Sequence, residues 1–315
     1  MSVQTAWHDP TFRFYVLLAS GALLLAGALL AVLRFGLGRN VEHAWRSYRG
    51  WLMMIPALLA ALFLGREVTI VFFTALGAAG LHEFARATGL SQNRPMYAAA
   101  QAGVAALGVV CLLTDPRLGV PGWYGLFMAL PVYVVAAILT MPILMNRTAG
   151  QLRDMALAVI GFIYFGFMFG HLAFLANSNH AYSYLLYLLF AVELNDVAAF
   201  TFGKMLGRRQ LRSNISAKKT WAGALGAVAV SLALPWLLKF TLPHFSAAEL
   251  LLLGLLVGIG GQLGDLAISV IKRDLDIKDM GTAIPGHGGV LDRIDSLIYV
   301  APLFLHTVRW FHDLY

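Results

Sequence analysis

Long apolar runs alternate along the chain with short polar connections. Most of these runs have about the 17 to 25 residues that a helix needs to cross the hydrocarbon core of a bilayer. They lie at residues 13–33, 49–64, 67–81, 96–114, 122–145, 155–176, 182–202, 221–239, 247–271 and 295–309. Because a bilayer offers the backbone no hydrogen bonds, spanning runs are expected to be helical.

The second and third runs are short and are separated only by Gly65 and Arg66. They form either a tight hairpin or one broken, re-entrant segment, so the expected number of spans is nine or ten. The pattern predicts an all-α, polytopic integral membrane protein with about nine to ten transmembrane helices.

Composition supports this class. The chain is 59% hydrophobic and 12% charged, whereas a soluble domain carries about 25% charged residues. Its one cysteine, Cys111, lies inside an apolar run, which excludes an intrachain disulfide and a cysteine-built metal site.

The net charge of +7 comes mainly from alternate connections between the runs. Connections rich in Lys and Arg stay on the cytoplasmic side of a membrane, so both termini are expected outside. This topology explains the basic charge, and no nucleic-acid partner is expected. The basic connections contain Arg34, Arg39, Arg46 and Arg49, then Arg86 and Arg94, then Arg147 and Arg153, then residues 203–219, and finally residues 272–295.

Nearly half of the charged residues lie in two stretches, residues 193–220 and 265–295. The site is therefore expected in the C-terminal part of one integral domain, with N-terminal transmembrane helices at 1–180 and a catalytic region at 181–315. His82 and Glu83, at the end of a run in the N-terminal part, are interpreted as interfacial residues rather than site residues.

The first stretch places Glu193 and Asp196 near the end of an apolar run. Carboxylates at membrane depth are costly and usually face a polar cavity, so these two are expected to line one. Beyond them, hydroxyl and ammonium groups precede a helix expected to begin near Trp221, whose first N–H groups also favour an anion. These candidate phosphate ligands are Ser216, Lys218 and Lys219.

The second stretch places Asp265, Ser269, Lys272 and Arg273 on one helix face. A glycine-rich segment at 281–289 then breaks the helical pattern and allows the backbone close to a ligand. Asp292 and Asp295 follow at the start of the last run. Three aspartates at one membrane interface would repel one another unless a cation joined them. Carboxylate oxygens suit Mg²⁺, which commonly bridges to substrate phosphates.

The run from Ser269 to Asp295, S-V-I-K-R-D-L-D-I-K-D-M-G-T-A-I-P-G-H-G-G-V-L-D-R-I-D, resembles the signature of phosphatidate cytidylyltransferases, or CDP-diacylglycerol synthases. The upstream segments N-D-V-A-A-F-T-F-G-K-M-L-G-R and I-S-A-K-K-T-W-A-G are similar to a second block of that family. Ala217 stands where the family usually has proline, and Ala222 where it often has glutamate. The resemblance covers about residues 190–300.

The resemblance implies that CTP and phosphatidate give CDP-diacylglycerol and pyrophosphate. CTP would arrive from the cytoplasm and phosphatidate from the bilayer, in a bacterial-type inner membrane with the active site facing the cytoplasm. Mg²⁺ is the implied cofactor, and a second cation is compatible with the pattern. A homodimer is compatible with the helix-packing glycines.

Similarity and geometry together assign the roles. The predicted metal ligands are Asp265 and Asp292, with Asp295 as a third ligand or as an acid behind them. Lys272 and His287 complete the predicted catalytic set, His287 contacting phosphate or transferring a proton, unless it only organises its loop through a hydrogen bond. The predicted phosphate ligands are Ser216, Lys218, Lys219, Lys272, Arg273, Lys278 and Arg293.

Two other functions fit parts of the pattern. A CTP-dependent polyprenol or phytol kinase would also be polytopic and use a metal nucleotide, but the run from Pro285 to Asp295 argues against it. A secondary transporter would explain acids near the midplane and small-residue helices such as 254–258. It would not explain why charge concentrates in a glycine-rich interfacial segment.

Overall fold

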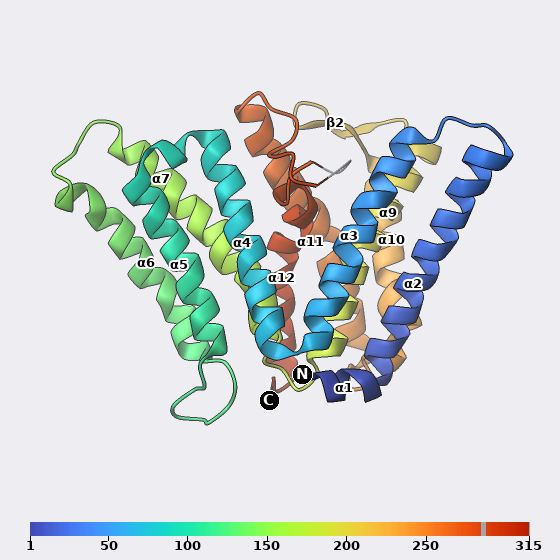
Figure 1. Cartoon of the computed structure of the whole chain (residues 1–315), viewed down its shortest axis with the longest axis horizontal. Helices are drawn as coiled ribbons and strands as arrows, with labels where there is room; N and C mark the ends of the chain where they lie inside the picture. Colours follow the sequence, from blue (N-terminus) through green and yellow to red (C-terminus); the bar gives the residue numbers. More distant parts are fainter. Residues whose placement is uncertain (285–287, 315) are drawn as a thin grey trace.

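The computed structural model describes residues 1–284 and 288–314, and these residues are almost entirely helical (Figure 1). The N-terminal helices are α1 (Val3–His8), α2 (Pro10–Ala31) with a π-helical continuation (Val32–Gly36), α3 (Glu42–Leu64), α4 (Arg66–Thr88), α5 (Arg94–Leu112), α6 (Tyr124–Leu144) and α7 (Gln151–Gly161), which runs through a π-helical segment (Phe162–Met168) into α8 (Phe169–Leu175). The C-terminal helices are α9 (Ala181–Leu206), α10 (Trp221–Leu237), α11 (Ala247–Asp274) and α12 (Leu291–Phe311). Short 3₁₀ turns lie at Leu90–Gln92 and Lys239–Thr241, and strands β1 (Gln210–Arg212) and β2 (Ser216–Thr220) form an antiparallel hairpin.

Each of the ten predicted apolar runs is largely helical. Within the described residues, eight helices are long and apolar enough to cross a membrane, namely α2 with its continuation, α3, α4, α5, α6, α7 to α8, α9 and α11. Helix α10 is shorter, with 17 residues. Helix α12 has 21 residues but begins with charged side chains. The predicted all-α polytopic fold is confirmed.

The short second and third runs belong to a helical hairpin and not to one broken segment. Helices α3 and α4 each have 23 residues and are joined at Gly65. This residue has φ = 114°, a backbone conformation that favours glycine. Thr69 Oγ1 closes the turn by donating hydrogen bonds to the carbonyl oxygens of Ala61 and Gly65.

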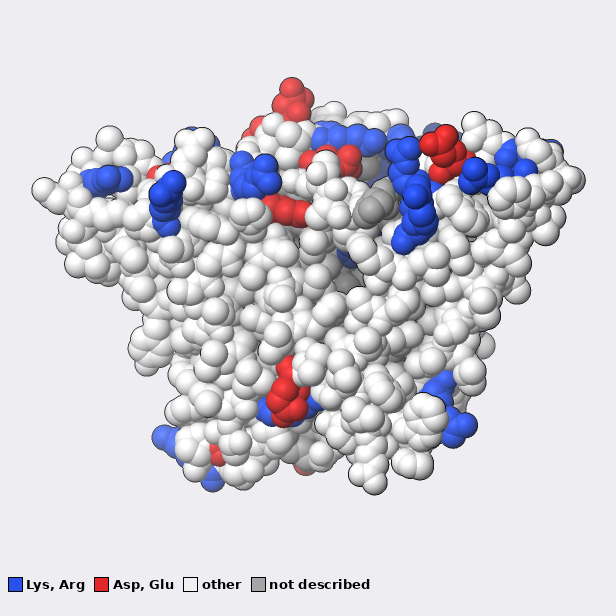
Figure 2. Space-filling model, viewed as in Figure 1, with Lys and Arg blue, Asp and Glu red and all other residues white. Residues whose placement is uncertain are grey.

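The two ends of the helical bundle differ in how many Lys and Arg side chains they expose. Both termini lie at one end, and β2 lies at the opposite end (Figure 1). Lys and Arg gather along the rim of that opposite end, above a broad uncharged band (Figure 2). This asymmetry is the one that the positive-inside rule predicts for an even number of crossings.

Cysteine labelling tests the orientation. In a Cys111→Ala background, we expect Ser213→Cys and Thr282→Cys to react with an impermeant thiol reagent only in inside-out vesicles. Arg117→Cys, which lies in the connection between α5 and α6, is expected to react in intact cells. The native side chains at all three positions are exposed. Labelling of the Ser213→Cys or Thr282→Cys variant in intact cells would reverse the orientation.

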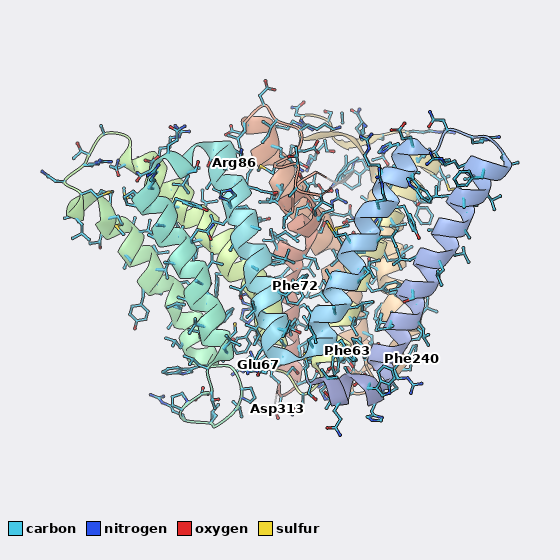
Figure 3. The ribbon with its side chains drawn as sticks, in the orientation of Figure 1. Phe63, Glu67, Phe72, Arg86, Phe240 and Asp313 are labelled. Atoms are coloured by element: carbon cyan, nitrogen blue, oxygen red, sulfur yellow. The ribbon has the colours of Figure 1, made fainter. Side chains whose placement is uncertain are left out.

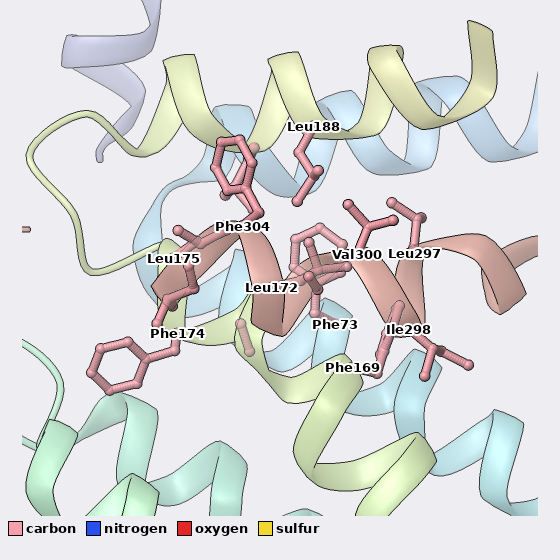
Figure 4. Packing of buried hydrophobic residues seen from close by; sticks show 14 of the residues in the cluster. Phe73, Phe169, Leu172, Phe174, Leu175, Leu188, Leu297, Ile298, Val300 and Phe304 are labelled. Atoms are coloured by element: carbon pink, nitrogen blue, oxygen red, sulfur yellow. The ribbon is translucent and has the colours of Figure 1, made fainter. Parts of the chain in front are cut away.

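Helix α12 lies in the interior of the bundle although it begins with charged side chains. Its buried side chains, among them Val300 and Phe304, pack against Phe73 of α4, Leu172 of α8 and Leu188 of α9 (Figure 4). The surrounding helices cover most of the first half of α12, whereas Leu303 and Trp310 further along are exposed. This position explains how the helix accommodates acidic residues at its start, because charged groups in membranes face the bundle interior.

Glycines let α11 approach its two neighbours closely. A Cβ atom on Gly264 would lie 2.7 Å from the carbonyl oxygen of Asp295 on α12, so only glycine fits there. Gly254 and Gly258 meet the backbone of α10 in the same way. These two glycines are therefore used within one chain and give no support for a homodimer.

Candidate functional site

Three helices bring acidic side chains together at the charged end of the bundle. Asp196 comes from α9, Asp265 from α11 and Asp295 from α12, and Asp295 is within electrostatic range of the other two carboxylates. The close contact at Gly264 accounts for the approach of Asp265 to Asp295. Ser296 Oγ lies 3.3 Å from Asp196 Oδ2 and donates a hydrogen bond to it. The polar cavity that Glu193 and Asp196 are expected to line stays a prediction.

Lys219 supplies a cation to this cluster. Its Nζ lies 2.5 Å from Asp265 Oδ2, and the exposed fractions of the two side chains are 23% and 30%. Ser269 Oγ donates to the other oxygen of Asp265 at 3.2 Å, as expected for residues one helical turn apart. Successive side chains point to opposite faces of a strand, so the neighbouring Lys218 of β2 is exposed.

The hairpin that carries Lys219 is fixed to the helix that follows it. Thr220 Oγ1 accepts a hydrogen bond from the N–H of Gly223 and so caps the N-terminus of α10. Gly223 in turn allows contact with α9, because a Cβ there would lie 2.5 Å from the carbonyl oxygen of Ala199. The predicted helix start at Trp221 is confirmed. Ser216, the predicted hydroxyl ligand, begins β2 and is half-buried.

Asp292 has a different environment from the other aspartates. Its Oδ1 lies 3.0 Å from Lys272 Nζ, and its Oδ2 accepts hydrogen bonds from the N–H groups of Met280 and Gly289 at 3.0 and 2.9 Å. The Asp292 side chain is 4% exposed. We predicted that Asp292 shares a metal with Asp265 and Asp295, and that role stays a prediction. In the structure, a lysine and two backbone N–H groups contact the carboxylate. One of these donors, Gly289, lies just before α12, and the other, Met280, lies in the connection that follows α11.

Glu83 of α4 belongs to the same region, although its sequence context indicated only an interfacial role. Its two oxygens accept hydrogen bonds from the N–H groups of Val290 at 3.0 Å and Leu291 at 2.9 Å. Glu83 lies more than 200 positions from these two residues in the chain, so no local pattern indicates the contact. The sequence shows only a glutamate near the end of one apolar run and a glycine-rich segment far along the chain. These two features do not predict that Glu83 contacts the start of α12.

The remaining predicted cations lie around these groups. Arg273 is exposed and donates to the carbonyl oxygens of Ile215 and Ile277. Lys278 is also exposed. Arg293 is half-buried and within electrostatic range of Glu193. His287 lies outside the described residues, and its predicted role is not tested.

The carboxylate oxygens of the site are suitable ligands for a hard divalent cation. Mg²⁺ is usually held by one or two protein carboxylates together with waters and substrate phosphates. Asp265 and Asp295 offer such carboxylates. Among the described residues, no three His, Cys, Asp or Glu side chains form a group able to hold a metal, so substrate phosphates would have to complete the coordination.

The fold and the site together define a class of protein. It is a polytopic membrane protein whose lysines and aspartates meet at one membrane face, an arrangement suited to a substrate that carries phosphate groups. Residues 46–311 match the model of the cytidylyltransferase family. The chain belongs to that family and is a membrane-embedded nucleotidyltransferase, which confirms the resemblance seen in its two sequence blocks.

Individual relatives span nearly the whole chain. The chain is 31% identical over 300 residues to a protein of Escherichia coli (strain K12) named uncharacterized protein YnbB, covering 92% of this chain and 97% of that one. It is 29% identical to the phosphatidate cytidylyltransferase of Staphylococcus aureus (strain COL), over 80% of this chain and 94% of that one. It is 29% identical to the phosphatidate cytidylyltransferase of Bacillus subtilis (strain 168), over 86% and 99%.

Proposed function

We propose that this nucleotidyltransferase transfers CMP from CTP to phosphatidate and so forms CDP-diacylglycerol and pyrophosphate. The observation that carries the proposal is the pair of lysine–aspartate contacts, Lys219 with Asp265 and Lys272 with Asp292, at one membrane face. Two relatives named phosphatidate cytidylyltransferase support it.

The chemistry needs charge and positioning more than a protein nucleophile. A phosphate oxygen of phosphatidate attacks the α-phosphorus of CTP, one P–O bond forms, and the bond to the β-phosphate breaks to release pyrophosphate. The nucleophile is already anionic, so no covalent enzyme intermediate is required. The protein must bring two polyanions together and stabilise the charge of the transition state. Lys219 and Lys272 are half-buried cations placed to do this.

We assign Asp265 and Asp295 as the residues that would hold Mg²⁺, with Asp196 nearby. When bound, the cation would neutralise phosphate charge and polarise the P–O bonds. Asp292 would instead fix Lys272 and the start of α12. The exposed Lys218, Arg273 and Lys278, with Ser216 and Arg293, form an outer group of phosphate ligands in this proposal.

The proposed location is the inner membrane of a bacterium, with the site facing the cytoplasm. CTP is a cytoplasmic nucleotide and phosphatidate stays in the bilayer, so the reaction belongs at that interface. The basic rim at the end where the site lies supports this orientation (Figure 2). The division into N-terminal helices and a catalytic region from residue 181 stays a prediction, as does a homodimer.

Transfer from labelled CTP tests the function. We expect purified protein with phosphatidate and Mg²⁺ to move the α-phosphate of CTP into a lipid and to release pyrophosphate, and omission of phosphatidate to stop both. Label moving from the γ-phosphate into lipid, with release of CDP, would show a lipid kinase instead. No transfer of either label under these conditions would refute the proposal.

A further inference from the structure

The start of α12 depends on a carboxylate from the N-terminal half of the chain. Val290, the residue before this helix, has helical backbone angles, and its side chain provides no cap. The N–H groups at this end are satisfied by two carboxylates. Asp292 accepts from Gly289, and Glu83 accepts from Val290 and Leu291. Acceptors are required here, because the first N–H groups of a helix have no partner within it.

Two glycines of the segment before α12, Gly281 and Gly289, leave room for the carboxylate of Glu83. A Cβ atom on Gly281 would collide with Glu83 Oε1, and one on Gly289 would collide with both carboxylate oxygens. Neither glycine has a positive φ. The reason for glycine at these positions is therefore the close approach of the Glu83 carboxylate rather than an unusual backbone conformation.

The part of α4 that carries Glu83 is packed against the core. Its neighbours Leu81 and Phe84 are buried in the core of the bundle, and α4 approaches α12 at Gly80, where a Cβ would lie 3.4 Å from Ile294. The carboxylate thus projects from a packed helix and holds the two residues that precede Asp292. Through them it fixes the carboxylate that pairs with Lys272.

We propose that Glu83 is a positioning residue for the reaction. It does not touch the substrate; it anchors the start of α12, so that Asp292, Lys272 and Asp295 keep the geometry that transfer requires. The kinetic consequence rests on the proposed function, whereas the anchoring of the segment does not. A displacement of about 1 Å at a reacting centre costs roughly 100-fold in rate.

The test compares Glu83→Gln with Glu67→Gln. Both residues are on α4, but Glu67 is exposed, pairs with Arg66 and lies at the opposite end of the helix from the site (Figure 3). Glutamine keeps the size of Glu83 but replaces one acceptor oxygen by an N–H₂ group that faces a donor. We expect kcat for CMP transfer to fall about 100-fold in Glu83→Gln, with KM for CTP changed by less than about threefold, while Glu67→Gln behaves as wild type.

A second readout is independent of the reaction. With Thr282→Cys in the Cys111→Ala background, Glu83→Gln is expected to raise the rate of thiol labelling about tenfold, because losing a charge-assisted hydrogen bond favours local opening. Glu67→Gln should not change that rate. If wild type transfers no CMP, the labelling still tests the anchor.

Two outcomes would overturn the inference. One is near wild-type turnover and labelling in Glu83→Gln, and the other is lost turnover with unchanged labelling, which would indicate direct action on the substrate. If Glu83→Gln fails to fold, Glu83→Asp, which keeps the charge, is measured in the same way. Faster labelling than wild type supports the anchor, and an unchanged rate contradicts it.

Discussion

Replacing Asp265 by asparagine is expected to lower CMP transfer by at least about 1000-fold, because under the proposed mechanism the change removes a metal ligand and a charge near the reacting phosphates, and with them several kcal/mol of transition-state stabilisation. The Asp265 side chain is 30% exposed and bonds only to Lys219 and Ser269 among the described residues. Loss of its charge should therefore change the thermal unfolding midpoint in detergent very little. Turnover with saturating CTP and the unfolding midpoint, measured on the same preparation, separate the two effects.

A matched control lies just beyond the end of the same helix. Asp276 is exposed and has φ = 52°, a conformation that asparagine also adopts readily. Asp276→Asn should keep wild-type turnover. If Asp265→Asn retained more than about a tenth of wild-type activity, a metal role for Asp265 would be excluded, since a lost metal ligand should cost far more.

The transmembrane helices could be predicted from the sequence because the bilayer leaves few alternatives. A run of apolar residues of sufficient length must form a helix. The ends were less well predicted, because α3 begins at Glu42 and α4 ends at Thr88, outside the predicted runs at 49–64 and 67–81. The hairpin of β1 and β2 was not predicted. It lies in a polar connection where no such constraint acts.

Part of the site could also be predicted from periodicity. Asp265 and Ser269 lie one turn apart on α11, and their hydrogen bond follows from that spacing. Lys272 and Arg273 differ by about 100° around the same helix. Only Lys272 turns inward, to Asp292, while Arg273 is exposed. Placing both residues on one helix face therefore did not predict which of them contacts the site.

The roles of Asp292 and Glu83 depend on where α12 begins. Asp292 and Asp295 are three positions apart, which suggested a common metal. Because α12 begins at Leu291, Asp292 falls in the first turn and binds backbone N–H groups, whereas Asp295 lies deeper and approaches Asp265. Glu83 reaches the same turn from α4. Such contacts arise from tertiary packing and leave no periodic signal in the sequence.

Lys219→Ala should lower kcat/KM for CTP by about 100- to 1000-fold, whereas Lys218→Ala should lower it only a few-fold. The two lysines are adjacent on β2, but Lys219 is half-buried against Asp265 and Lys218 is exposed. A cation inside a partly desolvated site stabilises phosphate charge far more than one in water. An exposed lysine near anionic lipid contributes about 1 kcal/mol, and salt screens its effect.

The comparison is made in mixed micelles at low and high ionic strength, with Lys219→Arg as a third variant that keeps the charge. The loss in Lys219→Ala should persist at high salt, and Lys219→Arg should recover part of the activity. The small loss in Lys218→Ala should diminish as salt is added. Equal, salt-sensitive losses in both alanine variants would mean that Lys219 acts as a surface charge, and the contact between β2 and Asp265 would then have no part in binding CTP.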